Sequence, residues 1–252
     1  MIKIAGNPLD PKALDDQYPD GSFEQSLLNK MSDTQVDYDS LEQLQFELEL
    51  RKTSVLAAKA LDQSKLDFAV FRKSRCNPHY WKRTDEGGFL LKDNVQSSAA
   101  IQDIYENSDD YATECATATV IVYLKAVLDV YPPALYDQAF PEIYLMNWHS
   151  VSPLLKGIGS LKTVQTLLPG DRIYFANPDV DPKTPEWQGE NTVMLDTDRF
   201  YGPGLGIHSR DTMIKLLNEH RMRGSDESAY MINQAGRPDY QRLFKVRQDY
   251  HP

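Results

Sequence analysis

The amino-acid sequence predicts an α+β fold in which helices come first and an antiparallel sheet follows. Strong helical periodicity occupies residues 40–63 and 116–130. Three extended patterns then follow one another between residues 172 and 207, RIYFANP, ENTVMLD and RFYGPGLGI, and a helical pattern at 209–221 comes last. Consecutive strands segregated from the helices are typical of α+β proteins with an antiparallel sheet.

The first half of the chain contributes the long helices. At residues 40–63, Leu41, Leu44, Leu48 and Val55 recur at helical spacing behind a capping Ser40. The polar residues Glu42, Glu47, Arg51 and Lys52 are expected on the other faces of this helix. Residues 67–92 predict short strands and loops, and 98–107 a short helix. The Ser-Asp-Asp turn at 108–110 then leads into the apolar helix that carries Cys115, which Pro132-Pro133 ends.

The second half contributes the sheet. EIYLMNWH predicts a strand or loop, and the turn LLPGD leads into RIYFANP. ENTVMLD follows as a strand, and RFYGPGLGI is expected to be one strand kinked at its glycines. Ser209 caps the last predicted helix, at residues 209–221.

The composition bounds the domain organisation and the partners. With 252 residues, 41% of them hydrophobic, the chain can bury a sizeable core, and we expect a single domain over residues 1–252. Residues 1–38, rich in Asp, Pro, Gly and Gln, are expected to form a loosely packed N-terminal arm with one short helix at 22–30. A net charge of -10 disfavours nucleic acid and anionic membrane surfaces as partners.

The sequence also indicates a cytoplasmic enzyme or scaffold without prosthetic groups. The start MIKIAGNPLD lacks the apolar core of a signal peptide. The apolar run 116–130 is interrupted by Lys125 and Asp129 and is shorter than the roughly 18 residues of a membrane span, so it predicts a buried helix. Cys76 and Cys115 form neither a disulfide framework nor a CxxC pattern. Dinucleotide, phosphate-loop, HExxH and GxSxG motifs are absent, so we expect no cofactor and no metal.

Cys115 is the first candidate for chemistry. If Thr113 or Asp110 caps its helix, the sulfur lies in the first turn, where free backbone N–H groups and the helix dipole favour a thiolate. The alternative is a small buried hydrophobe at the start of a core helix. Glu114, just before it, would support the helix N-terminus or act as a second titrating group.

A proton acceptor for the thiol is harder to find. The five histidines, at positions 79, 149, 208, 220 and 251, lie in segments that do not distinguish a catalytic from a structural role. Glu190, in WQGENTVML, opens an apolar strand, and burial there would raise the pKa of its carboxyl group towards neutrality. The alternative for Glu190 is a solvated charge at a strand end.

Five segments together resemble the protein-glutamine gamma-glutamyltransferases of spore-forming Bacillus, the spore-coat transglutaminases. They are FRKSRCNPHYWKRTDEGGFLL, AIQDIYENSDDYATECATATVIVYLKAVL, LPGDRIYFANPDVDP, EWQGENTVML and YGPGLGI. The resemblance implies that Cys115 is the nucleophile, Glu190 its catalytic partner and Glu114 a substitute partner. It implies protein substrates that supply Gln and Lys side chains, isopeptide cross-linking without a cofactor, and a place in the spore coat.

The resemblance extends to a wider fold group. PGDRIYF followed by a glutamate-led strand is similar to the bacterial murein-peptide cysteine peptidases, themselves similar to papain. It implies a papain-like core with the nucleophile at a helix N-terminus packed on a small antiparallel sheet. Phe68, Trp148 and Trp187 fall in or near the shared segments and are candidates for walling a substrate channel, with ordinary packing as their alternative.

One departure from the family pattern concerns the base. The Bacillus proteins carry a histidine in a [GA]-H-G-[LI]-G loop, where this chain has Pro203. Either Cys115 and Glu190 suffice, or His208, five residues later, supplies the imidazole; we favour the former, since five strand positions carry a side chain far away. A glutamine deamidase or peptide hydrolase of the same fold and a non-catalytic coat or scaffold protein are the rival hypotheses.

Overall fold

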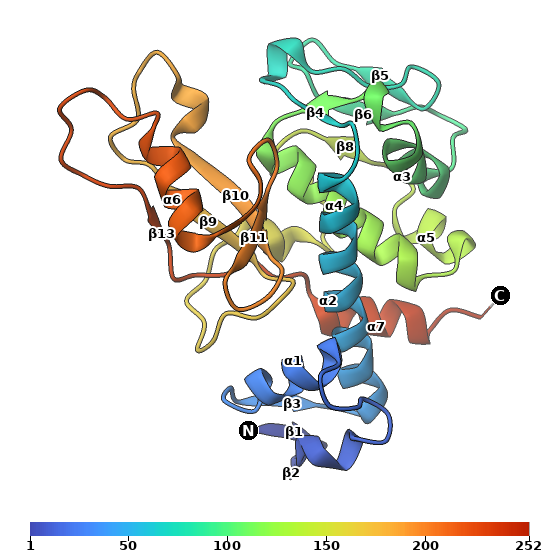
Figure 1. The fold of residues 1–252 in the computed structure, drawn as a ribbon. Coiled ribbons are helices and arrows are strands. Elements are labelled where there is room, and N and C mark those ends of the chain that lie inside the picture. Colours follow the sequence, from blue (N-terminus) through green and yellow to red (C-terminus); the bar gives the residue numbers. More distant parts are fainter. Residues whose placement is uncertain (252) are drawn as a thin grey trace.

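A computed structural model describes residues 1–251 and combines helices and sheets as expected for an α+β protein. The long helix α2 (Leu41–Asp62) runs through the centre of the molecule, and the other parts are arranged around it (Figure 1). The side chain of Ser40 caps α2 by accepting a hydrogen bond from the Gln43 N–H, which confirms the predicted start.

The largest sheet has five strands in the order β12-β11-β10-β9-β13, and all neighbouring strands pair antiparallel. Their bounds are β9 Arg172–Ala176, β10 Gly189–Met194, β11 Arg199–Gly202, β12 Gly206–Ser209 and β13 Tyr230–Met231. The predicted antiparallel sheet is therefore confirmed. The expectation of one kinked strand for RFYGPGLGI was wrong, because Gly204 and Gly206 adopt positive φ and reverse the chain, so that β11 and β12 form a hairpin.

Helix α4 (Cys115–Val130) packs along α2, and both helices contact β10. Twelve of the 16 residues of α4 are buried, which accounts for its almost wholly apolar sequence. Two further helices pack on α4, α3 (Ser97–Glu106) and α5 (Pro133–Ala139). Two small sheets complete this side: β5 (Trp81–Arg83), β6 (Phe89–Leu91) and β8 (Tyr144–Leu145), and the parallel pair β4 (Asp67–Phe68) and β7 (Ala112–Thr113).

The N-terminal residues are packed, which corrects the expectation of a loosely packed arm. They form a three-stranded sheet of β1 (Ile2–Ile4), β2 (Asn7–Pro8) and β3 (Val36–Tyr38), with α1 (Phe23–Met31) beside it. Ile2, Leu27 and Leu28 are fully buried in a cluster that also contains Leu44 of α2 and Leu168. The prediction was wrong because it was based on the mostly polar composition of the segment, whereas its few apolar residues are enough to form a buried cluster.

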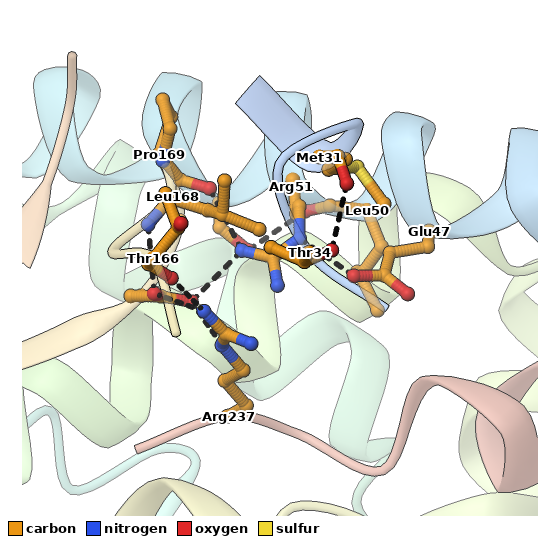
Figure 2. Close-up of polar contacts among 12 residues, drawn as sticks. Met31, Thr34, Glu47, Leu50, Arg51, Thr166, Leu168, Pro169 and Arg237 are labelled. Carbon is orange, nitrogen blue, oxygen red and sulfur yellow. Dashed lines mark hydrogen bonds and ion pairs between the residues drawn. The ribbon is translucent and has the colours of Figure 1, made fainter. Parts of the chain in front are cut away.

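The sequence pattern placed Glu47 and Arg51 on polar faces of α2, and the structure buries both. Arg51 is 0% exposed and donates to Glu47 at 2.8 Å and to Asp171 at 2.9 Å. Arg237 reaches the same Asp171 carboxylate from the side opposite Arg51 (Figure 2). Tyr38 donates to Glu47. This ion network connects α2 to the turn before β9. Glu47 and Arg51 are buried because α2 is packed on several sides and few of its faces reach solvent.

The last part of the chain returns to α2. Helix α6 (Arg210–Asn218) covers one face of the large sheet, from β12 to β13, and Ser209 caps it as predicted. Helix α7 (Tyr240–Gln248), which the sequence did not predict, packs against α2. Within residues 1–251, no helix is both long enough and apolar enough to cross a membrane.

Candidate active site

Helix α4 begins at Cys115 because Glu114 caps it. One carboxylate oxygen of Glu114 accepts the backbone N–H of Ala116 at 2.6 Å, and the other accepts that of Thr117 at 2.7 Å. The sequence suggested Thr113 or Asp110 as the cap, and this prediction was wrong. Thr113 belongs instead to β7, where its extended backbone pairs with Phe68. Cys115 occupies the first position of the helix, with a carboxylate beside it.

Cys115 lies in a cleft of about 770 Å³ between the α4 side of the molecule and the large sheet. Phe68 and Trp148 line this cleft on one side, and Tyr174 and Asn191 of the sheet line it on the other. Burial, followed by the negative charges of Glu190 and Glu114, raises the pKa of the Cys115 thiol. A contact with Asn191 acts in the opposite direction.

Glu190 is buried in β10, with 2% of its surface exposed. Its Oε1 has no hydrogen-bond partner among the described residues. Burial and the charge of Glu114 raise the pKa of this carboxyl group well above its ordinary value. Gly202 leaves little room beside this carboxyl group, because a Cβ there would lie 3.0 Å from Cγ and 3.2 Å from Oε1 of Glu190. The hairpin thus holds Glu190 closely, and no direct hydrogen bond joins it to Cys115 over residues 1–251.

The three predicted aromatic residues are found in two places. Trp148 and Phe68 line the cleft. Trp187 does not line it but stacks on Phe68 with ring centroids 5.8 Å apart. The other face of Trp187 stacks on His220 at 4.3 Å and 6°. Phe68, from β4, is therefore supported from behind by Trp187, from the short turn Pro185–Trp187 before β10.

Two site residues were missed by the sequence analysis, Asn191 and Arg172. Asn191 Nδ2 donates to Cys115 Sγ at 3.3 Å. Arg172 Nε and Nη2 donate to Asn191 Oδ1 at 3.0 and 2.5 Å. The Arg172 guanidinium lies 4.4 Å from the Trp148 ring centroid. The available signals were a polar residue directly after Glu190 in the predicted strand ENTVMLD and an arginine at the start of the preceding predicted strand, RIYFANP.

A comparison with protein families decides the family of this chain. The profile of the protein-glutamine gamma-glutamyltransferase family matches residues 1–247. The chain belongs to this family. It is a transglutaminase, an acyltransferase, as the five shared segments implied.

Individual relatives of this transglutaminase agree. The chain is 39% identical over 237 residues to a protein-glutamine gamma-glutamyltransferase of Halalkalibacterium halodurans, covering 92% of this chain and 81% of that protein. It is 39% identical over 241 residues to one of Bacillus cereus, covering 95% and 86%. The solved structure of a transglutaminase from Geobacillus stearothermophilus, without its C-terminal extension, superposes with a TM-score of 0.78 at 43% identity. That match covers 82% of this chain and 98% of the other.

Histidine does not contribute to the cleft of this transglutaminase: over residues 1–251, no histidine is among the residues that line it. His208 lies in β12, where its Nε2 bonds to the Leu205 carbonyl at 2.8 Å near Asp62. Pro203 is buried in the turn between β11 and β12. In the same described part of the chain, no group of three His, Cys, Asp or Glu residues is placed to hold a metal ion.

Proposed function

We propose that this transglutaminase joins glutamine and lysine side chains of proteins through a thioester at Cys115, with Glu190 as the proton acceptor. The observation that carries the proposal is the placement of a cysteine at a helix N-terminus, in a cleft, beside a buried carboxyl group with an unpartnered oxygen. A buried carboxyl group whose pKa is raised can both take and return a proton near neutral pH.

The first half-reaction forms the thioester. Glu190 takes the thiol proton, and Cys115 Sγ attacks the carbonyl carbon of a glutamine side chain. The tetrahedral intermediate collapses, its C–N bond breaks, and the proton on Glu190 goes to the departing ammonia. We propose that Glu190 and Cys115 come within hydrogen-bond distance when substrate enters, since catalytic contacts are often long in the free enzyme.

The second half-reaction releases the cross-linked product. A neutral lysine amine attacks the thioester carbon, a C–N bond forms and the C–S bond breaks. The amine proton passes through Glu190 to the cysteine sulfur, which restores the thiol. Water would give glutamate instead, so the cleft must exclude it. We propose that Phe68 and Trp148 serve this purpose and bind the extended parts of the two substrate side chains, while Trp187, which stacks on Phe68 outside the cleft lining, holds the Phe68 ring in place.

Glu114 is proposed as the substitute partner of Cys115. Both of its carboxylate oxygens are engaged with backbone N–H groups of α4. To accept the thiol proton it must give up one of these bonds. Its first role is therefore to start the helix, and its acid–base role is secondary to that of Glu190.

The wider setting is proposed from the family. The Bacillus relatives support a role in spore-coat assembly, with coat proteins as substrates. A papain-like core is supported by the proposed nucleophile at the start of a helix that packs on an antiparallel sheet. We further propose that residues 1–252 act as one domain, since α2 joins the clusters on either side of it.

Amine incorporation into a glutamine-containing protein tests the proposal. The unmodified enzyme should incorporate a fluorescent primary amine and release ammonia, whereas Cys115→Ala should do neither. Cys76→Ala, which removes the other thiol, is the matched control and should stay active. Glutamate formation without amine incorporation would identify a deamidase, and a fully active Cys115→Ala variant would overturn the nucleophile.

A further inference from the structure

The start of α4 does not supply the stabilisation that a thiolate requires. Free backbone N–H groups at a helix N-terminus normally favour a nearby negative charge. Here the Glu114 carboxylate accepts the N–H groups of both Ala116 and Thr117. It also places its own negative charge next to Cys115. The cysteine therefore needs a hydrogen-bond donor from elsewhere in the fold.

Among residues 1–251, Asn191 is the residue that donates to the sulfur: its side-chain amide forms the hydrogen bond, and its backbone N–H adds to the effect that lowers the pKa of the thiol. Its Nδ2 lies 3.3 Å from Cys115 Sγ, within the usual range for a bond to sulfur. Asn191 is 7% exposed, so the amide is largely shielded from water. A hydrogen bond to an ionised acceptor strengthens when the competing solvent is removed. The bond is therefore worth more to the thiolate than to the thiol.

Arg172 decides which end of the Asn191 amide faces the sulfur. A guanidinium group has donors only, so the two N–H groups that reach Asn191 must meet its oxygen. The amide nitrogen is then left to point at Cys115. This orientation follows from chemistry and does not depend on distinguishing nitrogen from oxygen in the amide.

Arg172 is itself held in place. It is 5% exposed, its guanidinium lies over the Trp148 ring at 4.4 Å, and its Nη1 donates to the Ile158 carbonyl at 3.2 Å. Arg172 and Asn191 come from the neighbouring antiparallel strands β9 and β10. The pair is thus built into the rigid centre of the sheet.

We propose that Asn191 is a further catalytic residue, whose amide stabilises the Cys115 thiolate, and that Arg172 is the positioning residue that fixes this amide. The inference rests on the proposed role of Cys115 as nucleophile. The charged and titratable groups that face the sulfur are Glu190 of β10, Glu114 before α4, and Arg172 and Tyr174 of β9. Two of these oppose ionisation of the thiol, which is why a fixed donor matters.

The first experiment compares Asn191→Ala with Asn191→Asp in a Cys76→Ala background, so that iodoacetamide reports on Cys115 alone. Each variant is alkylated between pH 7 and pH 10 and followed by mass spectrometry. Asn191→Ala should react about tenfold more slowly at neutral pH, with its alkylation profile displaced to higher pH. Amine incorporation should fall by a similar or larger factor.

Asn191→Asp separates a catalytic from a structural role. Aspartate keeps the shape and pairs with Arg172, so the thermal unfolding midpoint should be unchanged or higher. Its carboxylate would face the sulfur with oxygen, so alkylation and turnover should fall below those of Asn191→Ala. A folded Asn191→Asp variant with the alkylation profile and turnover of the parent would overturn the proposal.

The second experiment tests the positioning role of Arg172. Lysine can only donate, so Arg172→Lys should keep the amide orientation and retain much of the parent's alkylation profile. Glutamine can donate or accept, so Arg172→Gln should let the Asn191 amide rotate and shift the profile to higher pH, as Asn191→Ala does. Equal, parent-like profiles for Lys and Gln would refute the positioning role.

The outcomes also distinguish this inference from the proposed function. If Cys115→Ala keeps amine incorporation, the nucleophile is wrong and the role of Asn191 falls with it. If Cys115→Ala is inactive while Asn191→Asp and Asn191→Ala behave like the parent, only the inference is wrong.

Discussion

At the residue scale, the carboxyl group of Glu190 links catalysis to stability. Burial raises its pKa well above the ordinary value of 4.5, so the folded protein holds this proton more tightly than the unfolded chain does. The stability from this group is fully present below about pH 4.5 and is lost as pH rises through the raised pKa. The wild-type enzyme therefore carries a stability cost at neutral pH at the group that we propose as its base.

Glu190→Gln should remove that cost. The variant should unfold at a higher temperature than the wild type at pH 8, and the difference should shrink towards zero near pH 4.5. Amine incorporation should fall by about a hundredfold or more, since general base catalysis is lost. Calorimetry at several pH values, with Glu186→Gln, an exposed carboxylate four residues earlier, as a control, measures the effect. A difference that is independent of pH would contradict it.

The residue scale also shows where sequence reasoning stopped. Cys115, Glu190 and Glu114 were found through a family resemblance, because position alone did not separate a nucleophile from a buried thiol. Asn191 and Arg172 carry no motif of their own. Their relation is set by the register of β9 and β10, which pairs Asn191 with Tyr174, two residues beyond Arg172. That register became visible only in the folded sheet.

At the element scale, the start of α4 balances two demands. Glu114 stabilises the helix by capping it, but its charge raises the pKa of the neighbouring thiol. The cap thus favours folding and opposes ionisation of Cys115. The opposing donor from Asn191 comes from a different element, so neither sequence segment alone predicts the reactivity of the thiol.

Glu114→Gln separates these two effects. The neutral amide keeps one acceptor, so the free energy of unfolding should fall by about 0.5–1 kcal/mol. Loss of the charge should lower the pKa of Cys115 and speed its alkylation by iodoacetamide at neutral pH. Turnover should stay largely intact while Glu190 is present, and the double variant with Glu190→Gln should be inactive. Slower alkylation of Glu114→Gln would show that its charge does not act on the sulfur.

The starts of helices were predicted correctly where a local capping residue determines them. The caps Ser40 and Ser209 mark the starts of α2 and α6, as their hydroxyl groups predict. The prediction failed where tertiary packing decides: Arg51 is charged yet fully buried, and α7 has a polar sequence with few buried residues. Helical periodicity reports how many faces of a helix are apolar, not how many are covered.

At the scale of the whole molecule, the ion network around Asp171 connects distant parts of the chain. Arg51 belongs to α2, Asp171 to the turn before β9 and Arg237 to the segment before α7. Asp171 and Arg51 have no exposed side-chain surface. Such a network contributes less to net stability than its bonds suggest, but removal of one partner leaves a buried charge without compensation.

Arg51→Met should therefore lower the free energy of unfolding by about 3–5 kcal/mol, as measured by urea titration. Arg247→Met is the matched control, because Arg247 forms an ion pair with Glu49 in which both side chains are at least 40% exposed. That variant should lose about 1 kcal/mol or less. Equal losses for the two arginines would show that the buried network does not carry the predicted energy.

The proposed single domain makes a prediction about residues 1–38. Leu27 is fully buried there against α2, and Lys30 donates to Thr197, which follows β10. All three tryptophans, at positions 81, 148 and 187, lie outside this segment. If residues 1–38 unfold together with the rest, a substitution at Leu27 must shift the unfolding midpoint measured by tryptophan fluorescence, although all the tryptophans lie outside this segment.

Leu27→Ala should destabilise the protein by about 2–4 kcal/mol, because it removes a buried side chain and leaves a cavity. Under one cooperative transition, tryptophan fluorescence and far-ultraviolet circular dichroism should report the same lowered urea midpoint. Leu56→Ala is the control, since Leu56 is 51% exposed and its loss should change stability by about 0.5 kcal/mol or less. If the tryptophan transition of Leu27→Ala stays at the wild-type midpoint while the dichroism splits into two steps, residues 1–38 form a separate unit. Coincident curves would instead mean that the catalytic cleft and the N-terminal sheet share one folding equilibrium through α2.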